Sequence, residues 1–307
     1  MSVGELAALA TAVLWTLSTL AWTSAGKYVG ALAVSFLRLA ITCVFLAVYG
    51  RVFRGLWLPS DASADTWLIL GLSGFAGFFL GDLCFFKALL LIGPRLSLLM
   101  QSLTPPMVAI TSWLVLGKGL APRQWLAMAV TLAGVAWVVL ERPNDHASEH
   151  ASEHAPRRRR QGLWLAILAA AGQGIGYILS QEGMGDYDAV AATFIRVFGA
   201  MAGYGVLITL LRRWPAMAAA ARQPRAMAIM TFGAVVGPFA GVALSMVALR
   251  HCHAGVAATI FAIVPVLVLP FLIFLYREKV SLRAAGGAIL SVVGVALLVL
   301  WEPFPRE

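Results

Sequence analysis

The sequence predicts an all-α polytopic membrane protein with ten transmembrane helices in two inverted five-helix repeats. Three observations carry this prediction: an apolar composition, ten separate apolar runs, and a repeat of the sequence on itself. Of the 307 residues, 61% are hydrophobic and 12% are charged, whereas a soluble domain has about 45–50% apolar and 25% charged residues. So few charges cannot cover the surface of a water-soluble fold of this size.

Ten apolar runs are separated by charges or by Gly and Pro turn signals, and about 20 apolar residues suffice to cross a bilayer. The first run has no basic segment before it and has a counterpart in the second half, so we expect it to be a span rather than a signal peptide. An even number of spans places both termini on one side of the membrane. The runs cover residues 5–24, 31–50, 66–91, 95–116, 123–140, 163–181, 190–211, 226–249, 255–276 and 284–301.

The repeat is visible when the sequence is shifted along itself. A shift of 158 aligns Ser35-Phe36-Leu37-Arg38 with Thr193-Phe194-Ile195-Arg196. Matches of Arg, Pro and Phe at a constant offset are hard to explain by chance. A shift of 160 aligns Gly77 with Gly237, Phe79 with Phe239, Gly81 with Gly241, Pro105 with Pro265 and Arg123 with Arg283.

The repeats define three parts of the chain. Residues 1–140 are the first five-helix repeat, 141–161 a linker, and 162–307 the second repeat. The linker contains nine charged residues, which are too costly to place in hydrocarbon. Because it does not cross the membrane and each repeat holds an odd number of spans, the second repeat must enter from the opposite face.

The basic residues lie in short loops beside apolar runs, so the net charge of +9 indicates membrane orientation rather than a nucleic-acid partner. Loops on the linker's side hold more than twice as many Lys and Arg as loops on the side of the termini, which places the linker in the cytoplasm. The sequence contains no GxSxG, HExxH or P-loop motif. We therefore expect neither an enzyme nor an ATP-driven pump, and no cofactor.

No metal site or disulfide framework is predicted. Cys43, Cys84 and Cys252 lie in or beside apolar runs without CxxC spacing. Neighbouring histidines at 251 and 253 are spaced wrongly for one helical face. In the linker, a tandem ASEH repeat puts three histidines at a spacing of four, which a helix would align for metal binding, but Pro156 and four arginines favour a solvated tether. These three are His146, His150 and His154.

Four ionisable residues lie within predicted spans, where each needs a partner or water. Arg38 and Arg196 occupy equivalent positions in the two repeats. Each either has a structural role, capping carbonyls of a neighbouring helix or reaching the headgroups, or contacts the substrate or a gate. Asp82 and Lys87 have no charged equivalents in the second repeat, and they either line a cavity or form a buried ion pair. All four are candidates for coupling or gating, and we expect Asp82→Asn or Lys87→Met to abolish flux.

Other polar or aromatic residues within spans are candidates for lining a substrate cavity, although each could instead join helices together. Prolines at 105, 106, 265 and 270 interrupt the fourth and ninth runs, as a kink or as a break that frees carbonyls toward a cavity. We expect the first four of the cavity candidates to face one central space. The candidates are Trp15, Gln101, Gln173, Tyr177, Ser245 and Thr259.

Three stretches resemble the EamA family of the drug/metabolite transporter superfamily. They are residues 88–135, residues 248–295, and SFLRLAI at 35–41. The first two share an Ala-Leu start, a small-residue helix, a proline, a turn and a closing Gly-Val helix. The turn glutamate of the family is present as Glu278 but is replaced by Lys118 in the first repeat.

This resemblance implies a permease or exporter in the plasma (cell inner) membrane that works by alternating access, with a cavity where the repeats meet. The implied substrates are small metabolites, amino acids or drug-like molecules. Coupling to protons stays open, as does the oligomeric state. The family usually has cytoplasmic termini, which disagrees with the charge count, so the orientation stays open. The alternative is a non-transporting scaffold or sensor that uses residues 141–161 for docking.

Overall fold

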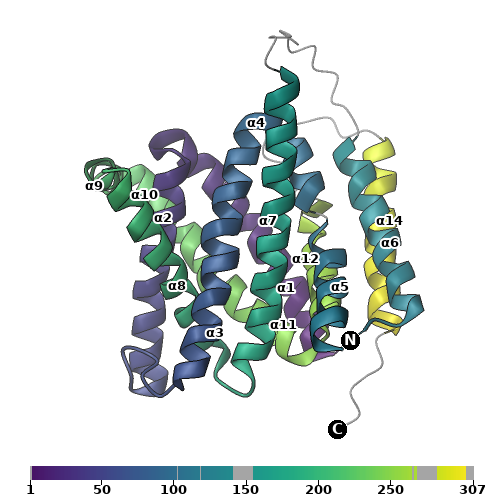
Figure 1. The fold of residues 1–307 in the computed structure, drawn as a ribbon, viewed down its shortest axis with the longest axis horizontal. Helices are drawn as coiled ribbons and strands as arrows, with labels where there is room; N and C mark the ends of the chain where they lie inside the picture. The colour runs from purple at the N-terminus through teal and green to yellow at the C-terminus, as the bar shows by residue number, and fades with distance from the viewer. Residues whose placement is uncertain are drawn as a thin grey trace. The chain divides into compact units, whose positions relative to one another are not determined.

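The computed structural model describes residues 2–101, 103–117, 119–140, 155–264, 266–267 and 282–301. Within these ranges the regular structure is entirely helical (Figure 1). The chain divides into two compact units. Of the described residues, unit 1 contains those between 81 and 174 and between 254 and 301, and unit 2 contains residues 2–80 and 175–253. Each unit therefore combines helices from both halves of the sequence.

Unit 2 brings the first helices of one half against the third helices of the other. Thr11 in α1 donates a hydrogen bond to the Gly241 carbonyl at 3.3 Å, and Ser73 in α3 donates to the Gly176 carbonyl in α7 at 2.7 Å. Its elements are α1 (Val3–Val29), α2 (Ala31–Tyr49), η1 (Gly50–Arg54), α3 (Ala64–Gly74), η2 (Phe75–Gly81, except its last residue), the end of α7 (Ala155–Met184), α8 (Ala189–Leu210), α9 (Trp214–Ala221), α10 (Pro224–Ala234), η3 (Val235–Gly241) and α11 (Val242–His251).

Local sequence sets several helix starts in unit 2. Ser2 and Glu5 form a reciprocal capping box at the start of α1. Ser63 caps α3 by accepting from the Thr66 amide, and Asp188 caps α8 by accepting from the Ala191 amide at 2.8 Å. Each cap satisfies an amide that would otherwise lack an intrahelical partner.

Unit 1 contains a helix pair packed at backbone contact. A Cβ added at Gly134 in α6 would lie 2.4 Å from the Ser291 nitrogen, and one added at Gly294 in α14 would lie 2.4 Å from the Thr131 nitrogen. These small residues allow α6 and α14 to lie side by side (Figure 1). The elements of unit 1 are α4 (Asp82–Gln101), α5 (Thr104–Leu116), α6 (Pro122–Leu140), the first part of α7, α12 (Ala254–Phe261) and α14 (Leu282–Trp301).

The helices keep the register of the sequence repeat. α3 and α10 begin and end 160 residues apart, and so do the π-helical segments η2 and η3 that follow them. Pro238 lies inside η3, and a π-helical turn is a usual way for a helix to accommodate a residue without an amide hydrogen. The halves therefore share an unusual local geometry as well as a sequence pattern.

Both halves also interrupt a helix at the same place. A turn at Leu103 separates α4 from α5, and α12 ends at Phe261 before turn residues 262–263. Pro105 and Pro106 occupy the first turn of α5, where a missing amide hydrogen costs little. The predicted interruption near these prolines is thus present as a break before the helix. Pro265 and Pro270 lie outside the described residues.

One predicted boundary is wrong. The gap expected at residues 92–94, between the third and fourth runs, is not a break, because α4 continues through Gly93 and Pro94 to Gln101. A helix in hydrocarbon keeps its internal hydrogen bonds wherever it can, and it tolerates Pro when neighbouring groups replace the lost bond. The glycine and proline were therefore a poor signal for a turn here.

Six helices in the described residues are long and apolar enough to cross a membrane, which identifies an integral membrane protein. They are Val3–Gly26, Leu32–Arg54, Ala64–Ala88, Arg157–Met184, Ala189–Leu210 and Pro224–His251. These correspond to the first, second, third, sixth, seventh and eighth predicted runs. The count of ten stays a prediction.

Candidate functional site

A buried arginine is the centre of the candidate site in unit 2. Arg196 in α8 is 1% exposed, and its Nε donates to Ser73 Oγ at 3.0 Å. Its Nη1 donates to the Met246 sulfur at 3.3 Å, and its Cζ lies 4.6 Å from the centroid of the Phe78 ring. These four residues, with Ser180 and Tyr177, are named the Arg196 cluster below.

Glycines allow the helices around this cluster to come close. A Cβ added at Gly74 would lie 1.7 Å from the Arg196 carbonyl oxygen, and one added at Gly176 would lie 3.2 Å from the Gly77 Cα. No side chain fits at the first of these contacts. The resulting close packing of α3 against α8 and α7 removes water from the guanidinium.

Two serines connect Arg196 to α7. The hydroxyls of Ser73 and Ser180 lie 2.7 Å apart, and both are within hydrogen-bond distance of the Gly176 carbonyl, at 2.7 and 2.5 Å. Because Arg196 donates to Ser73, this hydroxyl must direct its own proton to Gly176 or Ser180. The cluster therefore has a defined donor direction that starts at the guanidinium.

Tyr177, a predicted cavity residue, belongs to the same cluster. It is buried at 7% exposure, and its phenol interacts electrostatically with Arg196. The structure thus brings together one predicted gating residue and one predicted cavity residue from different spans. The serine and methionine partners were not predicted, because nothing in their local sequence sets them apart from ordinary helix-joining residues.

In unit 1, two of the predicted site residues, Asp82 and Gln173, form a hydrogen bond with each other. Gln173 Nε2 donates to Asp82 Oδ1 at 3.3 Å. Lys87, one and a half turns along α4, is exposed, and no ion pair joins it to another of the described residues. The alternative of a buried Asp82–Lys87 pair therefore has no support in the described structure. Gln101 is half-buried, and its Oε1 has no hydrogen-bond partner within the described ranges.

The remaining predicted residues have local roles that are compatible with either function or packing. Ser245 donates to the Val242 carbonyl at 2.7 Å and Thr259 to the Gly255 carbonyl at 2.7 Å, so each satisfies its own helix. A Cβ added at Gly241 would lie 2.9 Å from Trp15 Nε1. The half-buried Arg38 lies with its Cζ 5.1 Å from the Trp22 ring centroid.

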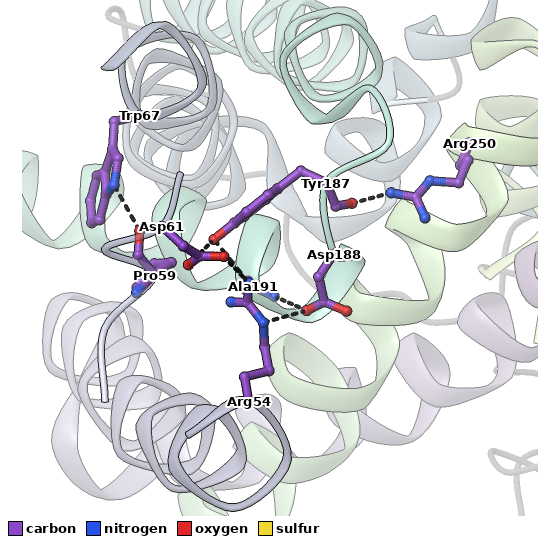
Figure 2. A network of polar contacts seen from close by, with 8 residues as sticks. All are labelled: Arg54, Pro59, Asp61, Trp67, Tyr187, Asp188, Ala191 and Arg250. Carbon is purple, nitrogen blue, oxygen red and sulfur yellow. Dashed lines mark hydrogen bonds and ion pairs between the residues drawn. The ribbon is translucent and has the colours of Figure 1, made fainter. Parts of the chain in front are cut away.

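A second polar network lies at the ends of helices of unit 2 and in the loops that join them (Figure 2). Arg54, at the end of η1, donates to Asp61 at 2.5 Å and to the Tyr187 hydroxyl at 3.3 Å. The Tyr187 hydroxyl donates to the other Asp61 oxygen at 2.9 Å. Arg54 Nε also lies 4.0 Å from the Asp188 carboxylate. Arg250 at the end of α11 donates to the Tyr187 carbonyl.

This network, named the Arg54 network, joins segments far apart in the sequence. It connects the loop after η1, the turn before α8, and the end of α11. Burial raises the pKa of Tyr187, and the hydrogen bond to Asp61 acts in the same direction while Arg54 opposes it. The phenol is therefore neutral near pH 7 and remains able to donate to Asp61.

Sequence reasoning missed the Arg54 network entirely. Asp61 and Tyr187 are separated by 126 positions, and each lies in a loop where a charged or polar residue is ordinary. No regular spacing in the sequence links these two residues, because their loops are brought together only by the packing of α2, α8 and α11. The one local signal was Asp188, which precedes an apolar run as a helix cap does.

No group of three or more His, Cys, Asp or Glu residues that could hold a metal lies within the described part of the chain. His251 faces outward with Nδ1 2.9 Å from the Val247 carbonyl, and Cys252 is buried beside it. His146, His150 and His154 lie outside the described residues.

Comparisons with known proteins agree with the duplicated helical fold. A solved structure entitled "Crystal structure of protein" is similar, with a TM-score of 0.74 and 19% identity over 97% of this chain and 96% of that chain. At that identity the likeness shows a shared fold alone. No curated protein matches. The model of the EamA-like transporter family matches residues 2–140 and 160–300. The chain, which carries this match in both halves, belongs to the EamA-like transporter family.

Proposed function

We propose that this chain is a secondary transporter that moves a small organic molecule across the plasma (cell inner) membrane by alternating access. The observation that carries the proposal is the family match to both halves of the chain, together with the identical register of their π-helical segments and helix breaks. A duplicated bundle with broken helices is the usual architecture of secondary transporters.

We infer ten spans in two inverted repeats, residues 1–140 and 162–307, joined by the linker 141–161. The reciprocal contacts of unit 1 support a two-fold relation between the halves, and the odd number of predicted spans in each half supports its inversion. Gly134 in α6 approaches Ser291, and its equivalent Gly294 approaches Thr131, the equivalent of Ser291. Equivalent contacts in both directions are expected of elements related by a two-fold axis. Both termini then lie on one side of the membrane.

Gradient-driven transport fits the chemistry of the described residues. The carboxylate of Asp82 lies within a helix and accepts a hydrogen bond from the Gln173 amide. A carboxylate within a membrane span can bind and release a proton, which makes Asp82 the candidate for proton coupling. Gln101, Gln173 and Thr259 of unit 1 and Trp15, Tyr177 and Ser245 of unit 2 remain candidates for lining the substrate path.

The Arg54 network fits the role of a closure at one end of unit 2. Its members come from three connections between helices, and these connections must move apart when the helix ends separate. Arg54 and Asp61 are 19% and 41% exposed, so water can replace their contacts at a modest cost in free energy. A closure of this kind can open and re-form during a transport cycle.

Flux into liposomes tests this function directly. Purified protein in proteoliposomes should exchange labelled amino acids, other metabolites or cationic dyes faster than protein-free liposomes do. The matched control is the Arg225→Gln variant, which removes an exposed arginine stacked 5.4 Å from the Tyr28 ring and should leave flux unchanged. A folded protein with no flux for any class would favour the alternative of a scaffold or sensor.

A further inference from the structure

The Arg196 guanidinium has more donors than its surroundings have acceptors. A guanidinium offers five N–H groups and no acceptor. In the described structure Nε reaches a serine hydroxyl, and Nη1 reaches only a thioether sulfur, which is a weak acceptor. Nη2 is buried and has no hydrogen-bond partner among the described residues.

Among the residues that the structure describes, no carboxylate forms an ion pair with this guanidinium. The described ion pairs of the chain both involve Arg54, and the groups around Arg196 are hydroxyls, a sulfur, a phenol and an aromatic ring. The position is about 12 Å along α8 from its cap Asp188, within a candidate span. An isolated cation at such a depth is costly unless an anion joins it.

The edge of the Arg196 guanidinium formed by Nη1 and Nη2 indicates which class of anion can bind there. The planar fork of Nη1 and Nη2 matches a carboxylate, which can accept two parallel hydrogen bonds. Only the weak sulfur contact must be given up on this edge, because Nε keeps its bond to Ser73. The Ser180 and Tyr177 hydroxyls lie in the same cluster and can contact other polar atoms of such a ligand.

We propose that the Arg196 cluster is a binding site for the carboxylate of a small organic anion, and that the transported substrate belongs to this class. Only the second statement, that the transported substrate is such an anion, rests on the proposed transport function. The guanidinium is 1% exposed in the described structure, so a ligand enters when α3 and α8 separate during the cycle.

A pair of isosteric probes tests the site by binding alone. Benzoate and benzamide have the same shape and differ in charge, so only benzoate should raise the thermal unfolding midpoint of the protein in detergent. Arg196→Gln should weaken the apparent benzoate affinity by roughly tenfold or more, because a charge-assisted bidentate contact is lost. Arg225→Gln removes one positive charge from an exposed position and should leave the affinity unchanged.

Several outcomes would overturn the site. These are equal stabilisation by benzoate and benzamide, unchanged benzoate affinity in Arg196→Gln, and stabilisation by inorganic phosphate but not by benzoate. Arg196→Met guards against a folding defect, since replacing an uncompensated buried cation by an apolar side chain should preserve the fold. If neither variant folds, Arg196 is structural and the proposal is wrong.

The transport assay separates this proposal from the proposed function. Benzoate binding that depends on Arg196, without flux of any carboxylate in proteoliposomes that do transport another class, would contradict the assignment of the substrate but not the site. Absence of all flux beside intact binding would contradict transport and leave the anion site standing.

Discussion

Asp82 and Lys87 lie close in the sequence but have different surroundings. Asp82 is bonded to Gln173, whereas Lys87 is exposed. Asp82→Asn should abolish flux while the fold is retained, because an amide can still accept the Gln173 hydrogen bond but cannot carry a proton. Uptake in proteoliposomes, measured beside thermal stability in detergent, checks this expectation.

The double variant distinguishes this account from a structural ion pair. Lys87→Met should change the free energy of unfolding by no more than about 0.5 kcal/mol, and its effect should add to that of Asp82→Asn, since the described residues contain no bond between them. A double variant that regains the stability or flux lost in Asp82→Asn would show that the two charges interact after all.

Tyr187 is the residue that holds the Arg54 network together. Tyr187→Phe removes the hydroxyl that donates to Asp61 and accepts from Arg54, and should lower the free energy of unfolding by about 1 kcal/mol. Chemical denaturation at neutral pH measures this. Thr209→Val is the control, because it removes an exposed hydroxyl that among the described residues bonds only to the nearby Gly205 and Trp214, outside the Arg54 network.

The same residue predicts a dependence of stability on pH. The pKa of Tyr187 is raised above its ordinary value of 10 in the folded protein, chiefly by burial. Its contribution to stability is therefore complete below pH 10 and is lost as the pH rises through the raised pKa. The thermal midpoint should fall in this alkaline range, and less steeply in Tyr187→Phe. Identical slopes for the two proteins would contradict the assignment.

At the scale of elements, the close approach of α3 and α8 depends on glycine. A Cβ at Gly199 would lie 2.3 Å from the Gly71 carbonyl oxygen, while one at Gly205, later in α8, would meet nothing within 4 Å. Gly199→Ala should lower stability by about 1–3 kcal/mol through overpacking. Gly205→Ala should raise it by roughly 0.5–1 kcal/mol, because alanine favours the helix. Both expectations are tested by comparing the thermal unfolding midpoints of the two variants with that of the unsubstituted protein in one detergent.

The elements show what a sequence of this kind can and cannot predict. Long apolar runs predict spans well, because hydrocarbon leaves the backbone few alternatives to a helix, and α1, α2 and α8 lie where expected. For the same reason, α4 continues through Gly93 and Pro94, where the sequence alone predicted a turn. The π-helical segments η2 and η3 were not predicted, because one widened turn does not alter an apolar pattern.

The candidate site was predictable only in part. Arg196 is conspicuous because charge is rare in an apolar run, and Tyr177 because an aromatic hydroxyl is. Their partners Ser73, Ser180 and Met246 are ordinary residues of membrane helices, and contacts across 50 to 123 positions follow from packing rather than from spacing. Likewise, the repeat was predicted from its offset, but the combination of both halves in each compact unit was not.

At the scale of the whole molecule, inversion requires that equivalent loops lie on opposite sides of the membrane. Ser60, in the loop before α3, and Ala221, at the end of α9, are both exposed and lie near equivalent points of the two halves. Neither substitution to cysteine touches the Arg196 cluster or Asp82. The native cysteines at 43, 84 and 252 are first replaced by alanine, so that each variant carries one thiol.

The inverted architecture is tested most directly by labelling these two single-cysteine variants with a membrane-impermeant maleimide. The labelling is carried out in intact cells and in inside-out vesicles. We predict that one variant reacts only in cells and the other only in vesicles, with Ala221→Cys on the cytoplasmic side because arginines 212, 213, 222 and 225 surround it. Reaction of both variants from the same side would contradict inverted repeats, and with them the mechanism of alternating access proposed for this chain.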